Sequence, residues 1–428
     1  MDYKKIIVQW KEFSIPDALP RKVKIDLNTE FILAITGPRR SGKTYLCFYL
    51  MKSLMKRVSR ENILYINFED EKLLQADAED IDNLLNTYYE LSNINNKQKI
   101  YIFLDEIQNA KNWDAWVRRI QETKKNIKLV LTGSSSKLLS KEISTKLRGR
   151  VINIEVFPLS FKELLEWKHI SYNLKTIEHS KERFKIKKLF TSYLRDGGYP
   201  AIVLNAEQKD TILQNYYESM IFKDVIERYK VKEIKKLKII SKLLFESLGK
   251  YISYNKTANR LKSLGFDVSK NTIINYVSYF EDAYLFFQNL RYEYSLTKQL
   301  GAIKKIYCID NGLVNAVSFR FSDNVGRAFE NLVYIELRRR KKEVYYHKSR
   351  YECDFIINEK NKITGVIQVC YSLDDEKTRK RELSGLLEAM DRFRLKKGLI
   401  ITEDESKIEN VNGKEITYVP LWKWLLRD

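Results

Sequence analysis

The segment Gly37–Thr44 has the residue types and the spacing of a phosphate-binding loop. It fits the pattern G-x-x-x-x-G-K-[ST], and its residues are Gly37, Pro38, Arg39, Arg40, Ser41, Gly42, Lys43 and Thr44. Glycines let backbone N–H groups turn toward phosphate oxygens, the lysine reaches the β and γ phosphates, and the threonine hydroxyl is a ligand for Mg²⁺. The loop therefore predicts a site that binds ATP with Mg²⁺ and hydrolyses the ATP.

Two adjacent acids, Asp105 and Glu106, end the apolar run in the segment KIYIFLDEIQ. Beside a phosphate loop, Asp105 is expected to hold Mg²⁺ and Glu106 to polarise the attacking water. Two acids at this place can also cap the helix that follows, and this alternative stays open.

Polar and basic residues after a third apolar run complete the candidate catalytic set. Ser134, in LTGSSSKLL, is expected to sense the γ-phosphate, with a helix cap as the alternative. Arg148 and Arg150, in LRGRV, are candidates for arginine fingers that act in cis or on a neighbouring subunit. The alternative for both arginines is a solvated basic turn.

This chemistry requires a sheet that brings the three segments together. The runs Phe31–Ile35 and Ile127–Thr132, and the run that ends at Asp105, each have the length of a buried strand. The residues after Thr44 have apolar residues at helical spacing. We therefore expect an α/β fold with a parallel sheet, in which strand, glycine loop and helix follow one another.

The motifs and their order resemble the AAA-type P-loop ATPases of archaea and bacteria that carry a further C-terminal domain of the DUF4143 type. The matching segments are GPRRSGKT, FLDEIQ, LTGSSSKLL, LRGR, VFPLSF, YLRDGGYP, GRAFENLVYIEL, ECDFII, QVCYSL and PLWKWLL. The resemblance implies a P-loop core that is followed by a helical lid. It also implies that Gly197, Gly198 and Pro200 line the base pocket of the nucleotide, with a turn that ends a helix as the alternative.

The middle of the chain has the pattern of a winged helix-turn-helix. Three helical segments, a glycine-containing turn at Gly265 and two aromatic strand-like segments, Tyr284–Tyr294 and Ile303–Ile309, follow one another. If this module binds DNA, the base contacts fall to Lys270, Asn271 and Asn275, and the phosphate contacts to Lys256, Arg260, Lys262 and Arg291. A module of this kind also docks proteins, and that alternative stays open.

The C-terminal segment resembles the restriction-endonuclease-like α/β fold. The nuclease site of that fold needs a helix Glu, an Asp, and Glu-x-Lys on the next strand. Glu330 and Asp354 match, but Gln368 replaces the second acid and Cys370 replaces the lysine. Gln lacks the charge that holds Mg²⁺, and Cys cannot replace an ammonium group. We therefore expect weak or no nuclease activity and a nucleic-acid-binding or regulatory role.

The length of 428 residues suits several domains, which we place at 1–160 (P-loop core), 161–236 (helical lid), 237–310 (winged helix-turn-helix) and 311–428 (restriction-endonuclease-like domain). The net charge of +21 favours a polyanionic partner, with nucleic acid first and an anionic membrane surface second, and a generally basic surface is the alternative. Among nucleic acids we expect DNA, with RNA as the alternative. Four scattered cysteines and three histidines argue against a structural zinc site and against a disulfide framework. No apolar run is long enough to span a bilayer, and we expect a cytoplasmic protein without a membrane partner.

Three functions follow as hypotheses. The first is an ATPase coupled to a DNA-binding or regulatory C-terminal module. The second is a nucleotide-gated switch that binds a protein partner, or a further copy of this chain. The third is an ATP-regulated nuclease. Salt-sensitive binding of DNA favours the first hypothesis over the second.

Overall fold

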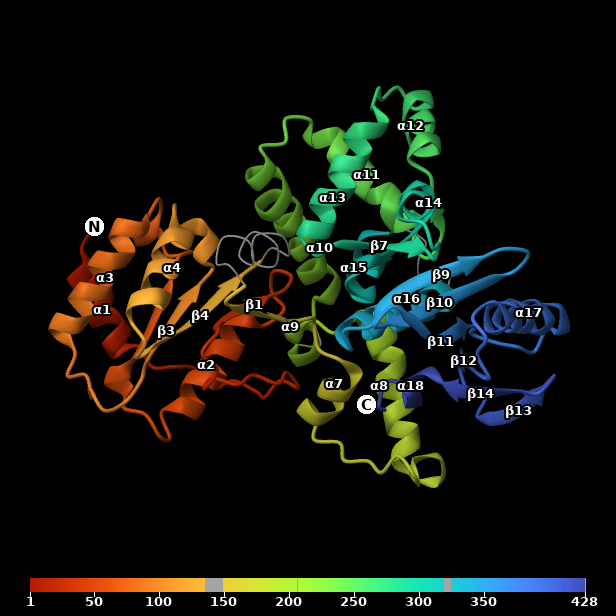
Figure 1. The fold of residues 1–428 in the computed structure, drawn as a ribbon, viewed down its shortest axis with the longest axis horizontal. Coiled ribbons are helices and arrows are strands. Elements are labelled where there is room, and N and C mark those ends of the chain that lie inside the picture. Colours follow the sequence, from red (N-terminus) through yellow and green to blue (C-terminus); the bar gives the residue numbers. More distant parts are fainter. Residues whose placement is uncertain (135–148, 206, 319–324, 428) are drawn as a thin grey trace. The chain divides into compact units, whose positions relative to one another are not determined.

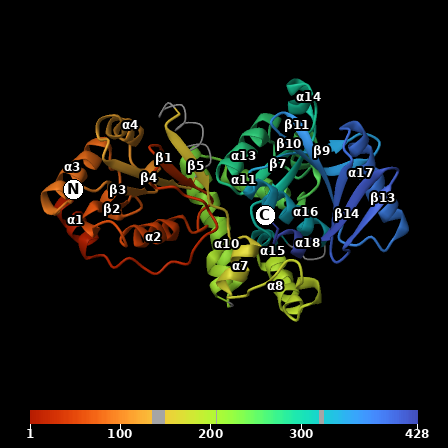
Figure 2. The ribbon, with the colours of Figure 1, turned by 60° about the horizontal axis from the view of Figure 1, so that its bottom comes forward.

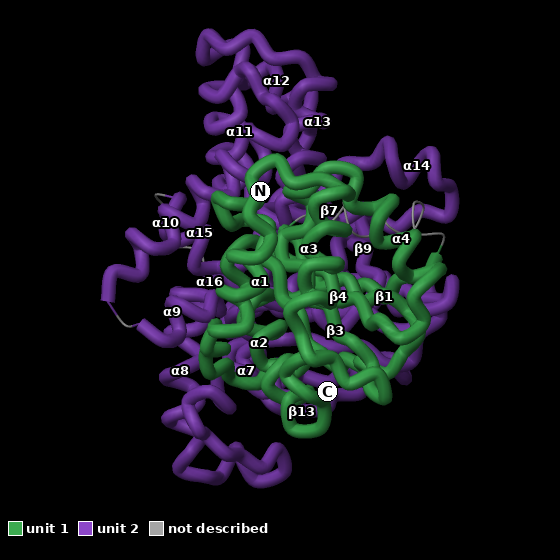
Figure 3. The backbone as a smooth tube through the Cα atoms, turned by 90° about the vertical axis from the view of Figure 1, so that its left-hand side faces the viewer, with its two compact units in different colours: residues 1–156 green, residues 157–428 purple. Residues whose placement is uncertain are grey.

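The structure, a computed structural model, describes residues 1–134, 149–205, 207–318 and 325–427. The chain forms two compact units, Met1–Val156 and Phe157–Asp428, which Figure 3 shows in different colours. The four domains expected from the sequence remain a prediction, and the last three of them fall within the second unit.

The first unit is built on a five-stranded sheet in the order β2-β3-β4-β1-β5. All neighbouring strands are parallel. The strands are β1 (Ile32–Thr36), β2 (Ile63–Asn67), β3 (Ile100–Asp105), β4 (Ile127–Gly133) and β5 (Val151–Glu155). Every residue of β1, β3 and β4 is buried, as expected for central strands of a parallel sheet that is covered on both faces. The expected α/β class with a parallel sheet is confirmed.

Helices connect these strands because parallel neighbours need a crossover. The connecting helices are α2 (Lys43–Leu54), α3 (Ala78–Leu91) and α4 (Trp113–Thr123), and a further helix, α1 (Tyr3–Glu12), precedes β1. Figure 2 shows α2 below the sheet and α4 above it. Strand β4 lies between β1 and β3, so the carboxyl ends of these three strands share one edge of the sheet.

The first part of the second unit is helical (Figure 1). Its helices are α7 (Phe161–Trp167), α8 (Glu182–Asp196), α9 (Pro200–Leu204), α10 (Lys209–Ser219), the π-helix Met220–Glu227, α11 (Ile234–Glu246), α12 (Tyr254–Ser263) and α13 (Lys270–Asp282). The Ser269 side chain caps α13 and accepts a hydrogen bond from the N–H of Thr272 at 3.0 Å. The apolar faces of these helices pack into one core.

The second unit also contains a nine-stranded sheet in the order β13-β14-β12-β11-β10-β9-β7-β8-β6. The strands are β6 (Tyr251–Ile252), β7 (Phe286–Arg291), β8 (Lys304–Cys308), β9 (Glu343–Lys348), β10 (Glu352–Glu359), β11 (Lys362–Val369), β12 (Lys397–Thr402), β13 (Lys407–Val411) and β14 (Lys414–Pro420). Strand β7 pairs with β9 in parallel. The hairpin expected to be the wing and the expected C-terminal domain therefore share one continuous sheet.

The remaining helices of the second unit are α14 (Leu296–Gly301), α15 (Asn311–Val317), α16 (Val325–Arg339), α17 (Glu376–Arg392) and α18 (Leu421–Trp424). Helix α14 lies in the connection between β7 and β8, where a wing would have its loop. None of the helices in the described part of the chain combines the length and the apolar character needed to cross a membrane.

Candidate active site

The phosphate loop has a backbone that only glycine adopts at two positions. Gly37 has φ 153° and Gly42 has φ 97°. A Cβ atom on Gly37 would lie 2.1 Å from the carbonyl oxygen of Val156. Gly42 directly precedes α2, so the loop ends at the amino terminus of a helix, where N–H groups and the helix dipole favour anions.

Lys43 is 4% exposed and holds the loop to the acid strand. Its ammonium donates to the carbonyl oxygens of Gly37 and Pro38, both at 3.2 Å. The same ammonium lies 3.3 Å from Glu106 Oε1. The structure thus brings together the lysine that is expected to reach the β and γ phosphates and the acid that is expected to polarise the attacking water.

Asp105, at the end of β3, accepts three hydrogen bonds from hydroxyl groups. Thr44 donates to Oδ2 at 2.7 Å and Tyr65 donates to Oδ2 at 2.8 Å, while Thr132 donates to Oδ1. Burial and the neighbouring charge of Glu106 raise the pKa of Asp105, and the three hydroxyls act against this shift. The two expected Mg²⁺ ligands, Thr44 and Asp105, are direct neighbours.

Glu106 is held in one position by its neighbours. Its backbone is left-handed, with φ 50°. Its N–H donates to Thr132 Oγ1 at 2.9 Å, and its Oε2 accepts from the N–H of Ser134 at 3.1 Å. Burial alone would raise the pKa of Glu106, but the Lys43 charge and the Gln108 hydrogen bond outweigh burial and lower it. A charged carboxylate with a fixed direction suits a group that orients water.

The donor set around the loop fits a triphosphate. The Ser41 hydroxyl oxygen is buried and has no hydrogen-bond partner among the described residues, although buried polar groups are nearly always paired. An ammonium, a helix amino terminus and this hydroxyl supply the donors that phosphate oxygens need. Thr44 and Asp105 supply oxygens of the kind that Mg²⁺ prefers.

Tyr65 and Thr132 belong to this site, although neither was singled out from the sequence. Tyr65 lies on β2 and Thr132 on β4, and both contact Asp105. Polar side chains inside otherwise apolar strands were the available signal, but strand order decides which of them face Asp105. Ser134 contributes its backbone N–H to Glu106, and its expected role as a γ-phosphate sensor remains a prediction.

In the described part of the chain, no candidate arginine finger lies at the phosphate loop. Arg148 lies outside the described part of the chain. Arg150 precedes β5, and its carbonyl oxygen accepts from the N–H of Ile32 at 3.0 Å, at the amino end of β1. The loop follows the carboxyl end of β1, roughly 15 Å away along the strand, and Arg150 pairs with Glu122 at 2.9 Å. Action of Arg150 within its own chain is therefore not supported, and action on a neighbouring subunit remains a prediction.

The carboxylate of Asp310 packs closely against Gly197 and Gly198. The N–H of Gly198 donates to Asp310 Oδ2 at 2.7 Å, and a Cβ atom on Gly197 would lie 1.8 Å from Asp310 Oδ1. Pro200 begins α9. These contacts give the two glycines a packing role, and the base pocket that the resemblance implies for Gly198 and Pro200 remains a prediction.

The nucleic-acid candidates are mostly on the surface of the second unit. Exposed positions are those of Lys256, Arg260, Lys262, Lys270, Asn271 and Asn275. Arg260 lies 3.4 Å from Glu246. Arg291 is different: it is partly buried in β7, between β8 and β9, and pairs with Glu293 at 3.0 Å. The structure separates Arg291 from the exposed group.

The two acids that match the nuclease pattern, Glu330 and Asp354, contact a lysine that was not singled out from the sequence. Lys305 Nζ lies 2.9 Å from Glu330 Oε1 and 3.0 Å from Asp354 Oδ1. Gln368 accepts from the N–H of Asp354 at 3.3 Å, and Cys370 Sγ donates to the carbonyl oxygen of Ser372 at 2.9 Å. Across the described residues, no three His, Cys, Asp or Glu side chains are grouped to hold a metal ion.

Comparisons with known proteins find three family models that match successive parts of the chain. The family described as AAA domain matches residues 29–165, the domain of unknown function DUF8612 matches 187–324, and the domain of unknown function DUF4143 matches 325–424. An uncharacterized protein of Methanocaldococcus jannaschii, MJ1544, is 39% identical over 95% of this chain and 90% of its own length. An uncharacterized protein of Haemophilus influenzae is 32% identical over 92% of this chain and 94% of its own length.

The chain belongs to this family of AAA-domain proteins with a C-terminal DUF4143 domain. Two solved structures are more distantly similar to this family member. The Walker-type ATPase of Pyrococcus abyssi is 13% identical, with 74% of this chain and 94% of that chain covered and a TM-score of 0.42. Cdc6p of Pyrobaculum aerophilum is 11% identical, with 71% and 87% covered and a TM-score of 0.27.

Proposed function

We propose that this protein hydrolyses ATP with Mg²⁺ at the loop Gly37–Thr44. The observation that supports this most is the connection of the loop to the acid strand at two points. Lys43 lies 3.3 Å from Glu106, and Thr44 donates to Asp105 at 2.7 Å. Loop cation, metal ligands and general base thus occupy one edge of the sheet, as phosphoryl transfer to water requires.

The residues of the loop and those at the carboxyl end of β3 have separate roles in the proposed reaction. Lys43 would exchange its contact with Glu106 for the phosphate oxygens, which frees the Glu106 carboxylate to orient a water molecule. Thr132 and Ser134 keep Glu106 in its direction through the two hydrogen bonds described above. Thr44 and Asp105 would hold Mg²⁺, which supplies charge neutralisation at the phosphates when bound.

We further propose that the second unit binds DNA, with RNA as the alternative polymer, under control of the nucleotide state. The support is the net charge of +21 together with the exposed lysines and asparagines of α12 and α13. Lys270 and Asn271 occupy the first turn of α13, the part of a recognition helix that contacts bases.

A specific observation favours a protein partner as the second candidate. Four apolar side chains around α14 are exposed, namely Tyr294 (78%), Leu296 (67%), Leu300 (56%) and Ile303 (49%). Exposed apolar side chains that are close in the chain mark contact sites for proteins more often than for nucleic acid. A nucleotide-gated switch with a protein partner would use this surface.

The first experiment measures steady-state ATP hydrolysis and nucleotide binding for Lys43→Ala and Glu106→Gln. We expect Lys43→Ala to lower kcat by about 100-fold or more. Glu106→Gln should bind Mg-ATP like the wild type but hydrolyse it about 100-fold more slowly. Lys52→Ala, at the far end of α2, and Glu79→Gln, exposed on α3, are the matched controls. Normal turnover by Glu106→Gln would remove Glu106 as the general base.

The second experiment repeats the hydrolysis assay with and without DNA over a series of salt concentrations. Stimulation by DNA that weakens steeply with salt supports the DNA-coupled ATPase. Hydrolysis that DNA does not change at any salt concentration favours the protein-partner switch.

A further inference from the structure

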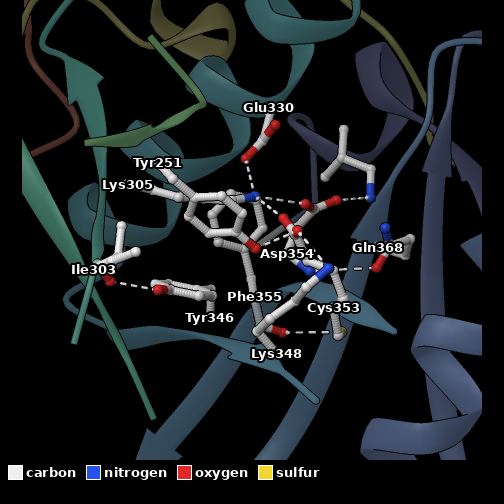
Figure 4. Close-up of polar contacts among 12 residues, drawn as sticks. Tyr251, Ile303, Lys305, Glu330, Tyr346, Lys348, Cys353, Asp354, Phe355 and Gln368 are labelled. Atoms are coloured by element: carbon white, nitrogen blue, oxygen red, sulfur yellow. Dashed lines mark hydrogen bonds and ion pairs between the residues drawn. The ribbon is translucent and has the colours of Figure 1, made fainter. Parts of the chain in front are cut away.

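Lys305 is buried among three carboxylates in the nuclease-like part of the second unit (Figure 4). It lies on β8 and is 3% exposed. Its ammonium is 2.9 Å from Glu330 on α16, and 2.6 Å and 3.0 Å from Glu352 and Asp354 on β10. An ammonium has three N–H donors, and here each donor has one carboxylate.

Each carboxylate is also oriented by a second partner. Tyr307 donates to Glu330 Oε1 at 2.6 Å, and Tyr251 donates to Glu352 Oε2. The N–H of Val369 donates to Asp354 Oδ2 at 3.0 Å. The positions of the three carboxylates are therefore fixed by these partners as well as by the ammonium.

The surroundings keep Lys305 charged. Burial would lower its pKa, but the charges of Glu330, Asp354 and Glu352 outweigh burial and raise the pKa well above its ordinary value. The rings of Tyr251 and Tyr346 have their centroids 5.9 Å and 6.0 Å from the ammonium, which is within the range of a cation–π contact.

The distances fit an ammonium and not a small metal ion. Charge-assisted N–H···O bonds are about 2.7–2.9 Å long, whereas Mg²⁺–oxygen distances are about 2.0–2.1 Å and Ca²⁺–oxygen distances about 2.3–2.6 Å. The three acids also line a cleft of about 540 Å³, whereas Lys305, which is 3% exposed, is not among the described residues that line it. The cation that these three acids share is thus part of the chain itself.

We propose that the Lys305 ammonium is the cation that Glu330, Glu352 and Asp354 hold in the place of a divalent metal, and that these acids become a divalent-cation site only when that ammonium is removed. In the natural protein, these three acids then hold no divalent metal ion. Lys305 also ties β8 to α16 and β10, because its three acids come from these two elements.

Mn²⁺ alone, titrated into nucleotide-free full-length protein and followed by the EPR signal of free Mn²⁺, tests this proposal. Lys305→Met keeps the length of the side chain and removes the charge. We expect Lys305→Met to bind one more Mn²⁺ per chain than the wild type. The double variant Lys305→Met/Asp354→Asn should lose that additional site, which separates it from any Mn²⁺ bound at Thr44 and Asp105.

Thermal unfolding of the same variants keeps the proposal testable if Lys305→Met folds poorly. Loss of the ammonium leaves three acids without their cation, so Lys305→Met should lower Tm, and the added Asp354→Asn should raise it again. If Asp354→Asn lowers Tm by the same amount with and without Lys305, the two groups are not coupled and the proposal is wrong.

Two results of the Mn²⁺ titration, and one result of a nicking assay, would overturn the proposal. One is a wild-type protein that binds one Mn²⁺ more than Asp354→Asn, because the cleft would then hold a metal beside Lys305. The other is a folded Lys305→Met that binds no more Mn²⁺ than the wild type. Plasmid nicking by the wild type that needs Mg²⁺ and is lost in Asp354→Asn would likewise show a metal site in this cleft.

Discussion

Thr44 Oγ1 donates a hydrogen bond to Asp105 Oδ2 at 2.7 Å. Thr44 lies in the first turn of α2 and Asp105 is the last residue of β3. The two side chains come together because the carboxyl ends of β1 and β3 lie on either side of β4 at one edge of the sheet. A single Mg²⁺ would take an oxygen from each, directly or through water.

The first prediction concerns the metal requirement of Thr44→Ala. Removing the hydroxyl takes away one expected metal ligand and one hydrogen bond that orients Asp105. The Mg²⁺ concentration for half-maximal ATP hydrolysis should rise by about 10-fold or more. Thr87→Ala is the control, because the Thr87 hydroxyl bonds to the carbonyl oxygen of Asn83 in its own helix. An unchanged Mg²⁺ requirement would separate Thr44 from the metal.

The second prediction concerns Tyr65, whose hydroxyl donates to the same oxygen of Asp105 at 2.8 Å. Tyr65→Phe should raise the Mg²⁺ requirement by about 10-fold or less, because such partners orient a ligand without contacting the metal. At saturating Mg²⁺, kcat should return to the wild-type value. Tyr101→Phe, on β3, is the control. A low kcat that excess Mg²⁺ does not restore would contradict a positioning role for Tyr65.

Local motifs could be interpreted from the sequence, whereas contacts between distant strands could not. Gly37–Thr44 and the pair Asp105–Glu106 carry their chemistry in adjacent residues, and the parallel sheet that positions them is confirmed. Tyr65 and Thr132 reach Asp105 only because β2 and β4 are the two neighbours of β3. The sequence contains no signal for that order beyond the apolar character of the strands.

The same limit applies to the second unit. The nuclease pattern was compared with Glu330, Asp354, Gln368 and Cys370. Lys305 stayed outside that comparison, because it comes from β8, which the sequence places in a different module. Pairing of β7 with β9 brings that hairpin into the C-terminal sheet. Sheet register, and not local spacing, decides which cation meets these acids.

The third prediction concerns the DNA contact of Lys256, an exposed residue in the first turn of α12. If Lys256 contacts a phosphate, Lys256→Ala should weaken DNA binding equally for all sequences. The slope of log K against log salt concentration should fall by about 1. Lys397→Ala is the control, because Lys397 is exposed in the same unit and pairs with Glu415 at 2.9 Å. Equal slopes for wild type and Lys256→Ala would exclude this phosphate contact.

The fourth prediction concerns the pH dependence of stability through Asp310. Burial raises the pKa of Asp310 to about 6 from an ordinary value of 3.8, and the N–H groups of Gly198 and Gly312 act against this shift. Because the folded pKa is higher than the unfolded one, the folded state binds the extra proton between these values. The stability that Asp310 contributes is therefore complete below about pH 3.8 and is lost as the pH rises through about 6.

Urea unfolding of wild type and Asp310→Asn at about pH 5 and about pH 7 measures this effect. Asn has no proton to lose, so the free energy of unfolding of the variant should not decrease through this titration. The free energy of unfolding of the wild type should fall by on the order of 1 kcal/mol over this interval. Asp310→Asn should be less stable at both values, because one N–H of Gly198 or Gly312 loses its carboxylate acceptor. The difference between the two proteins should therefore narrow toward pH 7. Asp267→Asn, at an exposed position, controls for charge, and parallel pH profiles for wild type and Asp310→Asn would rule out this titration.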